Sequence, residues 1–122
     1  MQELSFSEFG RNDSENITKA NFYYTEGLQA RKQENFREAI NFYKKALEWN
    51  QKHFKALFSC GVAFDKIGEI EKAVECYSQA LVLEPNSGFC EYNKGISLEK
   101  LSRTEEAIEC FSRAITIDDS KG

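Results

Sequence analysis

The side chains that most often carry catalysis or bind metals are few in this sequence, and their spacing suits neither task. His53 is the single histidine of the 122 residues, and no nucleophile is placed to pair with it. The four cysteines are Cys60, Cys76, Cys90 and Cys110, and they form no CxxC pair. That spacing argues against a zinc site and favours reduced, packed thiols of an intracellular protein. The sequence therefore predicts a protein that is not an enzyme and uses no metal or cofactor.

Composition and charge exclude further classes of function. Asp and Glu outnumber Lys and Arg by 20 to 16, and the resulting net charge of −4 disfavours broad contact with nucleic-acid phosphates. No apolar run approaches the roughly 20 residues of a membrane helix. The N-terminus lacks the basic and apolar segments of a secretory signal. We expect a soluble cytoplasmic protein that does not bind nucleic acid and does not insert into membranes.

Apolar residues recur in steps of three and four, which predicts helices separated by short polar turns. The expected helices cover residues 16–32, 36–49, 54–66, 70–83, 88–100 and 104–117. Gly68 falls where a helix end favours a left-handed residue, and Pro85 follows a helix that it cannot continue. The pattern indicates an all-α domain over residues 15–121, preceded by a flexible arm of residues 1–14. Alternatively, Leu4, Phe6 and Phe9 of this arm dock on a hydrophobic surface.

Four columns of small and aromatic residues repeat with a constant step of 34 residues. They are Gly27, Gly61 and Gly95; Ala39, Ala73 and Ala107; Tyr43, Tyr77 and Phe111; and Ala46, Ala80 and Ala114. Glycine inside a helix costs about 0.8–1.0 kcal/mol relative to alanine, so its recurrence indicates close packing of helices. Three unrelated helical hairpins would not keep one period.

This pattern resembles the tetratricopeptide repeat, or TPR, a helix–turn–helix unit of about 34 residues. Residues 20–53, 54–87 and 88–121 each match, and the second repeat fits best, with Leu57, Gly61, Phe64, Ala73, Tyr77, Ala80 and Pro85. The resemblance implies a right-handed α-α superhelix of three antiparallel helix–turn–helix repeats whose first helices line a concave face. Glu91 replaces the large apolar residue of the third repeat, so we expect it to face solvent or bind a ligand.

By analogy with the family, several columns of the first helices face the concave groove. They comprise aromatic Tyr24, Phe58 and Tyr92, aliphatic Leu28, Val62 and Ile96, basic Lys32, Lys66 and Lys100, and polar Ser59 and Asn93. The resemblance implies a non-catalytic module that binds a peptide segment of a partner protein, with apolar anchors in the groove and acidic residues at the lysines. Two simpler interpretations stay open: the aromatic residues pack between first helices, and the lysines form a solvated face.

One subfamily is excluded by its binding residues. Chaperone-binding members hold a C-terminal carboxylate with Lys, Asn and Arg side chains at five positions. The matching residues here are Tyr24, Leu28, Ser59, Phe89 and Asn93, and none is the required type. We therefore do not expect a carboxylate-clamp co-chaperone.

The last helix suggests an alternative function. Ile108, Phe111 and Ile115 lie along it, and no polar capping helix follows, although solenoids normally end with one. The alternative is a scaffold or assembly module that self-associates through this face, which we call the self-association face. Gly122 stands where a fourth repeat would begin, so continuation of the solenoid is the other expectation. The identity of the partner does not follow from the sequence.

Overall fold

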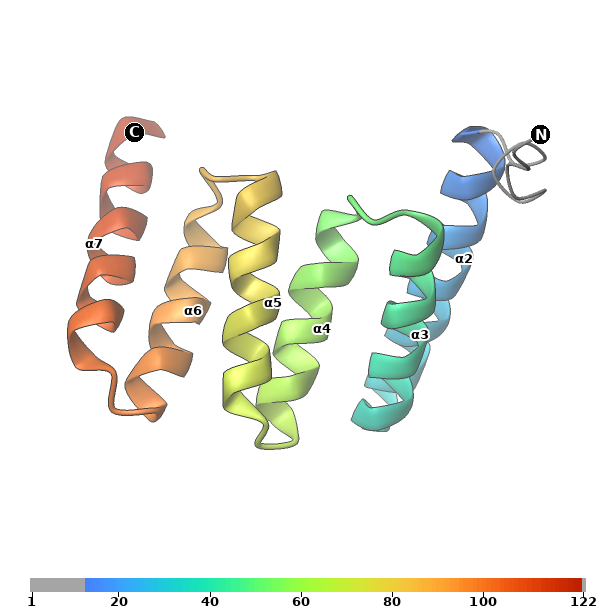
Figure 1. Cartoon of the computed structure of the whole chain (residues 1–122), viewed down its shortest axis with the longest axis horizontal. Helices are drawn as coiled ribbons and strands as arrows, with labels where there is room; N and C mark the ends of the chain where they lie inside the picture. Colours follow the sequence, from blue (N-terminus) through green and yellow to red (C-terminus); the bar gives the residue numbers. More distant parts are fainter. Residues whose placement is uncertain (1–12, 122) are drawn as a thin grey trace, which may run out of the picture.

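The computed structural model describes the backbone of residues 13–121 and the side chains of residues 13–118. The helices, labelled as in Figure 1, are α2 (Asp13–Lys32), α3 (Phe36–Trp49), α4 (Phe54–Lys66), α5 (Ile70–Leu83), α6 (Gly88–Lys100) and α7 (Thr104–Lys121). The four helices from α3 to α6 have the predicted bounds. Helix α2 begins three residues earlier than predicted, and α7 ends four residues later. Most of the predicted arm, with Leu4, Phe6 and Phe9, lies outside the described residues.

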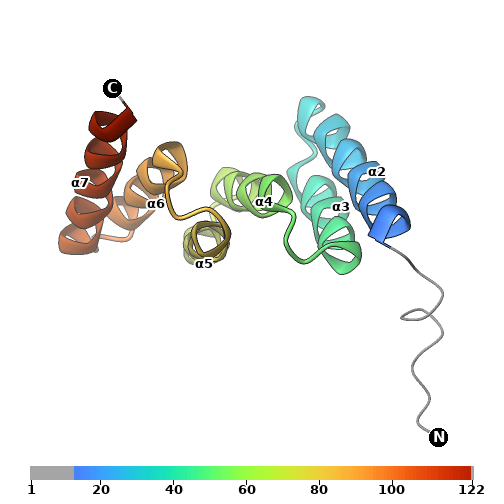
Figure 2. The ribbon, with the colours of Figure 1, turned by 90° about the horizontal axis from the view of Figure 1, so that it is seen from above.

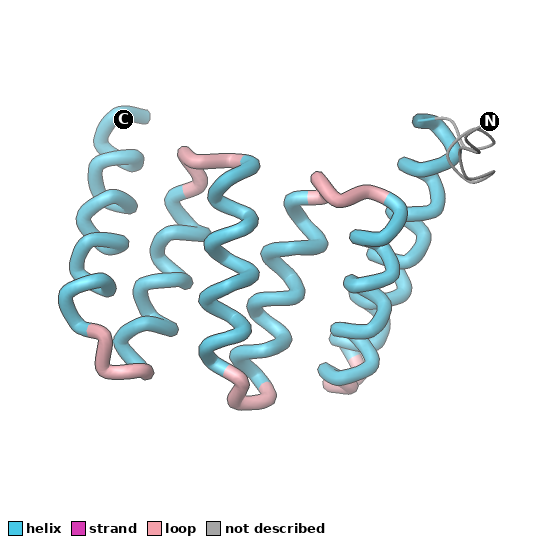
Figure 3. The backbone as a smooth tube through the Cα atoms, in the orientation of Figure 1, coloured by secondary structure: helices cyan, strands magenta, loops and turns pink. Residues whose placement is uncertain are grey.

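The helices pack pairwise as three helix–turn–helix repeats, α2 with α3, α4 with α5 and α6 with α7. Within the described chain, extensive contacts join only helices that follow one another in sequence. Figure 3 shows these helices joined by short loops, and Figure 2 shows the row from above, with α2 and α7 at opposite ends. The predicted all-α architecture of three repeats is confirmed.

The glycine column exists because an aromatic ring lies directly against the backbone of each first helix. A Cβ atom added to Gly61 would stand 2.6 Å from the Tyr77 ring, and one added to Gly95 would stand 2.6 Å from Phe111. Gly27 faces Tyr43 in the same way. Real Cβ atoms do not approach other carbon atoms so closely, so the close packing predicted from the period is confirmed.

Each turn between the paired helices contains one residue in the left-handed conformation. Gly68 has φ of +86°, as predicted, and the residues one period away, Glu34 and Ser102, have φ of 61° and 62°. Side chains with a Cβ atom adopt this conformation at a cost. The turn geometry is therefore shared by the three repeats, although only the central one uses the residue that suits it.

Glu91 is buried, with 5% of its surface exposed, so the expectation that it faces solvent is wrong. Arg113 Nε, on α7, donates a hydrogen bond to Glu91 Oε2 at 2.9 Å. The other carboxylate oxygen, Oε1, has no partner in the part of the chain that the structure describes. The hydrogen bond to Glu91 is also the main reason that the pKa of Arg113 is raised. An ion pair thus replaces the usual apolar contact between the helices of the third repeat.

Candidate binding groove and terminal helix face

The predicted groove residues lie on the three first helices, α2, α4 and α6, at equivalent places one period apart. The aliphatic residues Leu28, Val62 and Ile96 are half-buried, and the lysines Lys32, Lys66 and Lys100 are exposed. None of these lysines forms an ion pair with the described residues. The arrangement brings an aliphatic column beside a column of free positive charge.

The aromatic column packs between neighbouring repeats in two of its three places. The Tyr24 ring lies 4.9 Å from His53, which immediately precedes α4. The Phe58 ring lies 4.9 Å from Phe89 on α6, edge to face. Tyr92 is 54% exposed, and its ring contacts Phe111 of its own repeat. Packing therefore accounts for Tyr24 and Phe58, and Tyr92 is the ring that remains accessible.

The polar groove residues are partly engaged in the chain itself. Asn93 Nδ2 donates a hydrogen bond of 2.7 Å to the Phe89 carbonyl oxygen, one turn earlier on α6. Ser59 is half-buried and lies near Tyr43, whose pKa is raised by burial. One of the two N–H groups of the Asn93 amide is therefore used within α6, which leaves fewer groups for a ligand than the sequence suggested.

A hydrogen-bonded cluster that sequence reasoning missed joins the second and third repeats. Asp65 Oδ2, on α4, accepts hydrogen bonds from the Tyr77 hydroxyl at 2.9 Å and from Ser97 Oγ at 2.8 Å. Burial, with the nearby Asp65 charge, raises the pKa of Tyr77. The cluster links α4, α5 and α6. Its only sequence signal is a serine, Ser97, where the second repeat has Ala63.

The self-association face is exposed where the equivalent residues of earlier repeats are covered. Ile108 is 56% exposed, whereas Val74, one period earlier, is 8% exposed and Ile40, two periods earlier, is 5% exposed. Ile115 is 61% exposed, and Phe111 is half-buried. The first helix of the following repeat covers Ile40 and Val74. The difference in exposed fraction therefore indicates how much of Ile108 an equivalent helix would bury on α7.

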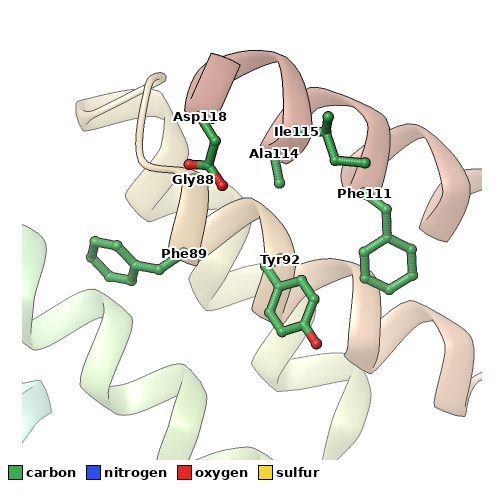
Figure 4. A pocket seen from close by; sticks show the side chains of 7 residues that line it. All are labelled: Gly88, Phe89, Tyr92, Phe111, Ala114, Ile115 and Asp118. Atoms are coloured by element: carbon green, nitrogen blue, oxygen red, sulfur yellow. The ribbon is translucent and has the colours of Figure 1, made fainter. Parts of the chain in front are cut away.

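An apolar pocket of about 540 Å³ lies between α6 and α7 at this end of the molecule. Its walls are formed by Gly88, Phe89, Tyr92, Phe111, Ala114, Ile115 and Asp118. Figure 4 shows Asp118 beside Gly88 at one end, Phe111 at the other, and Tyr92 between them. The pocket joins the accessible aromatic residue of the groove to the self-association face, with one carboxylate at its edge.

The single histidine has a structural role. His53 Nδ1 accepts a hydrogen bond from the Ala56 amide at 3.1 Å and thereby caps α4. Its Nε2 then carries the proton and donates to Asn21 Oδ1 at 3.0 Å. Burial lowers the pKa of His53 and keeps the ring neutral. Both ring nitrogens are therefore used in structural hydrogen bonds, Nδ1 in the helix cap and Nε2 in the contact between repeats.

The four cysteines are free thiols. Burial raises the pKa of Cys90 to about 12 and also raises that of Cys110. A hydrogen bond between Cys60 and Cys76 lowers the pKa of the first and raises that of the second. In the described part of the chain, no three His, Cys, Asp or Glu side chains are grouped to hold a metal ion. None of the described helices combines the length and apolar character that crossing a membrane requires.

The comparisons with known proteins agree with the period and the geometry. The sequence matches the tetratricopeptide repeat family over residues 20–53, 54–87 and 89–121. The chain belongs to this family, and TPR domains mediate protein–protein interactions. A stretch of 61 residues is 33% identical to the uncharacterized protein MJ0572 of Methanocaldococcus jannaschii, covering 50% of this chain and 71% of that protein.

Three solved structures have the same fold at low sequence identity. MamA superposes with a TM-score of 0.83 at 24% identity, over 88% of this chain and 63% of MamA, so the chain spans less than two thirds of that protein. The TPR domain of Arabidopsis OM64 gives 0.81 at 21% identity, over 85% and 86% of the two chains. The second TPR of Spaghetti (RPAP3), solved bound to the HSP90 peptide SRMEEVD, gives 0.80 at 20% identity, over 84% and 94%.

Proposed function

We propose that the concave groove binds a peptide segment of a partner protein and that the chain is a non-catalytic interaction module. The observation that carries this proposal is the exposed Tyr92 ring, which lies beside an apolar pocket and on the same helix as Lys100. An aromatic ring at an accessible, concave site is a typical anchor for a bound side chain. The free lysines at the C-terminal ends of the first helices favour acidic residues in the ligand.

The structure of Spaghetti (RPAP3) with a bound peptide supports use of the fold for peptide binding. The mode of recognition is expected to differ here, because the carboxylate-clamp positions hold Tyr24, Leu28, Ser59, Phe89 and Asn93. The ligand is therefore an internal segment with apolar anchors and flanking acidic residues, and a free C-terminal carboxylate is not required.

A phage library of random 12-residue peptides, selected on the immobilised chain, tests this function. We expect enrichment of sequences that combine apolar with acidic residues. Isothermal titration with a selected peptide is expected to show at least tenfold weaker binding to Tyr92→Ala and several-fold weaker binding to Lys66→Ala. Val82→Ala is the matched control, because Val82 is 79% exposed and lies on α5, a second helix. Selected peptides that bind Tyr92→Ala and Lys66→Ala as tightly as the natural chain would exclude the groove.

The second candidate function is that of a scaffold or assembly module that uses the self-association face. The observation in its favour is the exposure of Ile108, at a position that the earlier repeats bury, and of Ile115, at a position that they half-bury. Either a second copy of the chain or another protein would cover the face. Sedimentation equilibrium distinguishes them: concentration-dependent association that Ile115→Lys abolishes identifies a second copy, and a monomer at high concentration excludes it.

A further inference from the structure

We propose that the exposed apolar face of α7 binds one basic, amphipathic helix of a partner protein, with two small residues seven positions apart. This inference rests on the second candidate function and names its partner. The binding site is a surface that we call the terminal docking surface, formed by Tyr92, Ile108, Phe111, Ala114, Ile115 and Asp118. Two equivalent surfaces exist inside the molecule, and the helices that cover them indicate what the third one fits.

Helix α6 covers the second of these surfaces with small, fully buried residues. Cys90 Sγ donates a hydrogen bond of 3.6 Å to the Tyr77 carbonyl oxygen, and Ser97 Oγ reaches Asp65. Both residues are 0% exposed and lie two helical turns apart, so they share one face. Their equivalents on α4, Ala56 and Ala63, are 0% and 2% exposed. A helix that packs on this kind of surface therefore needs two small residues at a spacing of seven.

Each internal surface is also closed by a ring from the start of the incoming helix. His53 lies against Tyr24 at the first surface, and Phe89 lies against Phe58 at the second. Tyr92 is the third member of that column and is 54% exposed. The partner helix is accordingly expected to carry an aromatic or imidazole ring in its first turn, where it would cover Tyr92.

Helix α7, which provides most of the terminal docking surface, is negatively charged, although α6 ends with the exposed base Lys100. Among the described side chains of α7, Glu105, Glu109 and Asp118 are exposed acids without an ion pair, and the basic residue, Arg113, is bound to Glu91. Glu99 is exposed and lies one period after Asp65. In the second repeat, Asp65 accepts a hydrogen bond from Ser97 of α6, the helix that covers that repeat. Opposite charge favours association and selects among partners, so a basic helix fits this surface.

A second copy of the chain fits poorly. Its first helix, α2, has Phe22 and Gln29 at the two positions that must be small, and Phe22 is 56% exposed. Two copies meeting through α7 would bring together two helices that both carry an excess of acidic side chains. Both arrangements carry a cost that a basic helix from another protein avoids.

A synthetic peptide tests this inference, and its template is the segment Ser87–Leu101, the internal occupant of the second surface. The probe carries Cys90→Ala to avoid oxidation and Gly95→Ala to raise helix content. Glu91→Lys and Glu99→Lys change its formal side-chain charge from 0, with two Glu and two Lys, to +4. One control peptide has leucine at positions 90 and 97, and a second keeps both glutamates.

Fluorescence anisotropy of the labelled peptides with the whole chain gives the affinities. We expect the probe to bind at least tenfold more tightly than the leucine control and several-fold more tightly than the acidic one. Ile115→Glu is expected to weaken binding at least tenfold, whereas Val82→Glu, a matched exposed site on α5, leaves it unchanged. Because Ile115 is 61% exposed, circular dichroism should show the same unfolding temperature for the Ile115→Glu chain.

Two outcomes would overturn the inference. The first is a failure of specificity, in which the probe and the leucine control bind equally well or the Ile115→Glu chain binds the probe as tightly as the natural chain. In the second, sedimentation shows self-association that Ile115→Glu removes, which would assign the surface to a second copy. Lys66→Ala separates this inference from peptide binding in the groove, because Lys66 lies on α4, away from the terminal docking surface. That variant should weaken the phage-selected peptides and leave the probe unaffected.

Discussion

The second and third repeats form the same helix pair, but among the described residues only the second is covered on both sides. Val74 on α5 is 8% exposed because α6 lies over it, and Ile108, its equivalent on α7, is 56% exposed. Tyr77 is completely buried and hydrogen-bonded to Asp65, whereas Phe111 is half-buried and has no hydroxyl group. The outer residues of a repeat are therefore buried by the neighbouring repeat, as expected for a linear stack.

The comparison also separates residues that are used in packing from residues that stay accessible. In the second repeat, the columns of large residues are buried by packing against α6. In the third, the same columns form a pocket and an apolar face that a ligand can reach. The proposed docking on α7 would therefore use the residues with which the second repeat contacts its neighbour.

The largest difference is expected for a charge placed at the equivalent positions Val74 and Ile108. Val74→Asp places an unpaired carboxylate in the interface with α6 and should lower the free energy of unfolding by about 3 kcal/mol. Ile108→Asp leaves the carboxylate in water and should change it by less than about 1 kcal/mol. Urea denaturation followed by circular dichroism measures both values. Equal losses would mean that α7 is as well covered in solution as α5.

The next largest effect concerns the contact between glycine and the aromatic ring. Gly61→Ala gains helix propensity but places a methyl group 2.6 Å from the Tyr77 ring, which is fully buried and cannot withdraw. We expect a net loss of about 2 kcal/mol in the free energy of unfolding. Gly95→Ala meets Phe111 at the same distance, but that ring is half-buried and can turn toward solvent. Thermal denaturation should therefore show a smaller loss for Gly95→Ala, and a loss as large as that of Gly61→Ala would contradict this account.

The fold could be predicted from the sequence because the repeat period carries it. One step of 34 residues fixes which glycine meets which aromatic ring, and α3 to α6 have the predicted bounds. The ends of α2 and α7 were less predictable, because they lie at the margins of the repeat pattern and the apolar periodicity fades there. The groove assignment was an analogy and remains a prediction, except that Tyr24 and Phe58 are engaged in packing.

The departures from the repeat pattern could not be predicted, because each depends on a distant partner. Glu91 looked like a solvent-facing replacement until Arg113, 22 residues later, proved to lie against it. Asp65 and Ser97 are separated by 32 residues and meet only when α6 packs on α4 and α5. A single sequence shows that these residues break the pattern, but it does not show which of them compensate one another.

A smaller effect is expected from the tyrosine hydroxyls of the first two repeats. Tyr77→Phe removes the hydrogen bond to Asp65 and should cost about 1 kcal/mol, measured by urea denaturation at pH 7. Tyr43→Phe should cost almost nothing, because the Tyr43 hydroxyl is buried without a hydrogen bond to the described residues. A cost for Tyr43→Phe that matches Tyr77→Phe would show that its hydroxyl is paired in solution.

The difference in stability between the natural chain and Tyr77→Phe is expected to depend on pH. The pKa of Tyr77 is raised in the folded chain from its ordinary value of 10.0, so folding favours the neutral phenol. Above pH 10 the unfolded chain releases this proton while the folded chain retains it, and the natural protein loses stability as the pH rises. Phenylalanine has no proton to lose, so the gap between the natural chain and Tyr77→Phe should narrow at pH 11.

The smallest effect tests the turns that join the paired helices. Ser102 has φ of 62° between α6 and α7, at the position where the second repeat has Gly68. Ser102→Gly removes the strain of a left-handed serine but gives the unfolded chain more freedom, so the net gain should be only about 0.5 kcal/mol. Gly68→Ser should produce a loss of similar or larger size, because serine is strained at the φ of +86° that Gly68 adopts. Thermal unfolding of both variants and the natural chain measures these changes. If Ser102→Gly were no more stable than the natural chain, the left-handed conformation of Ser102 would not be strained in solution.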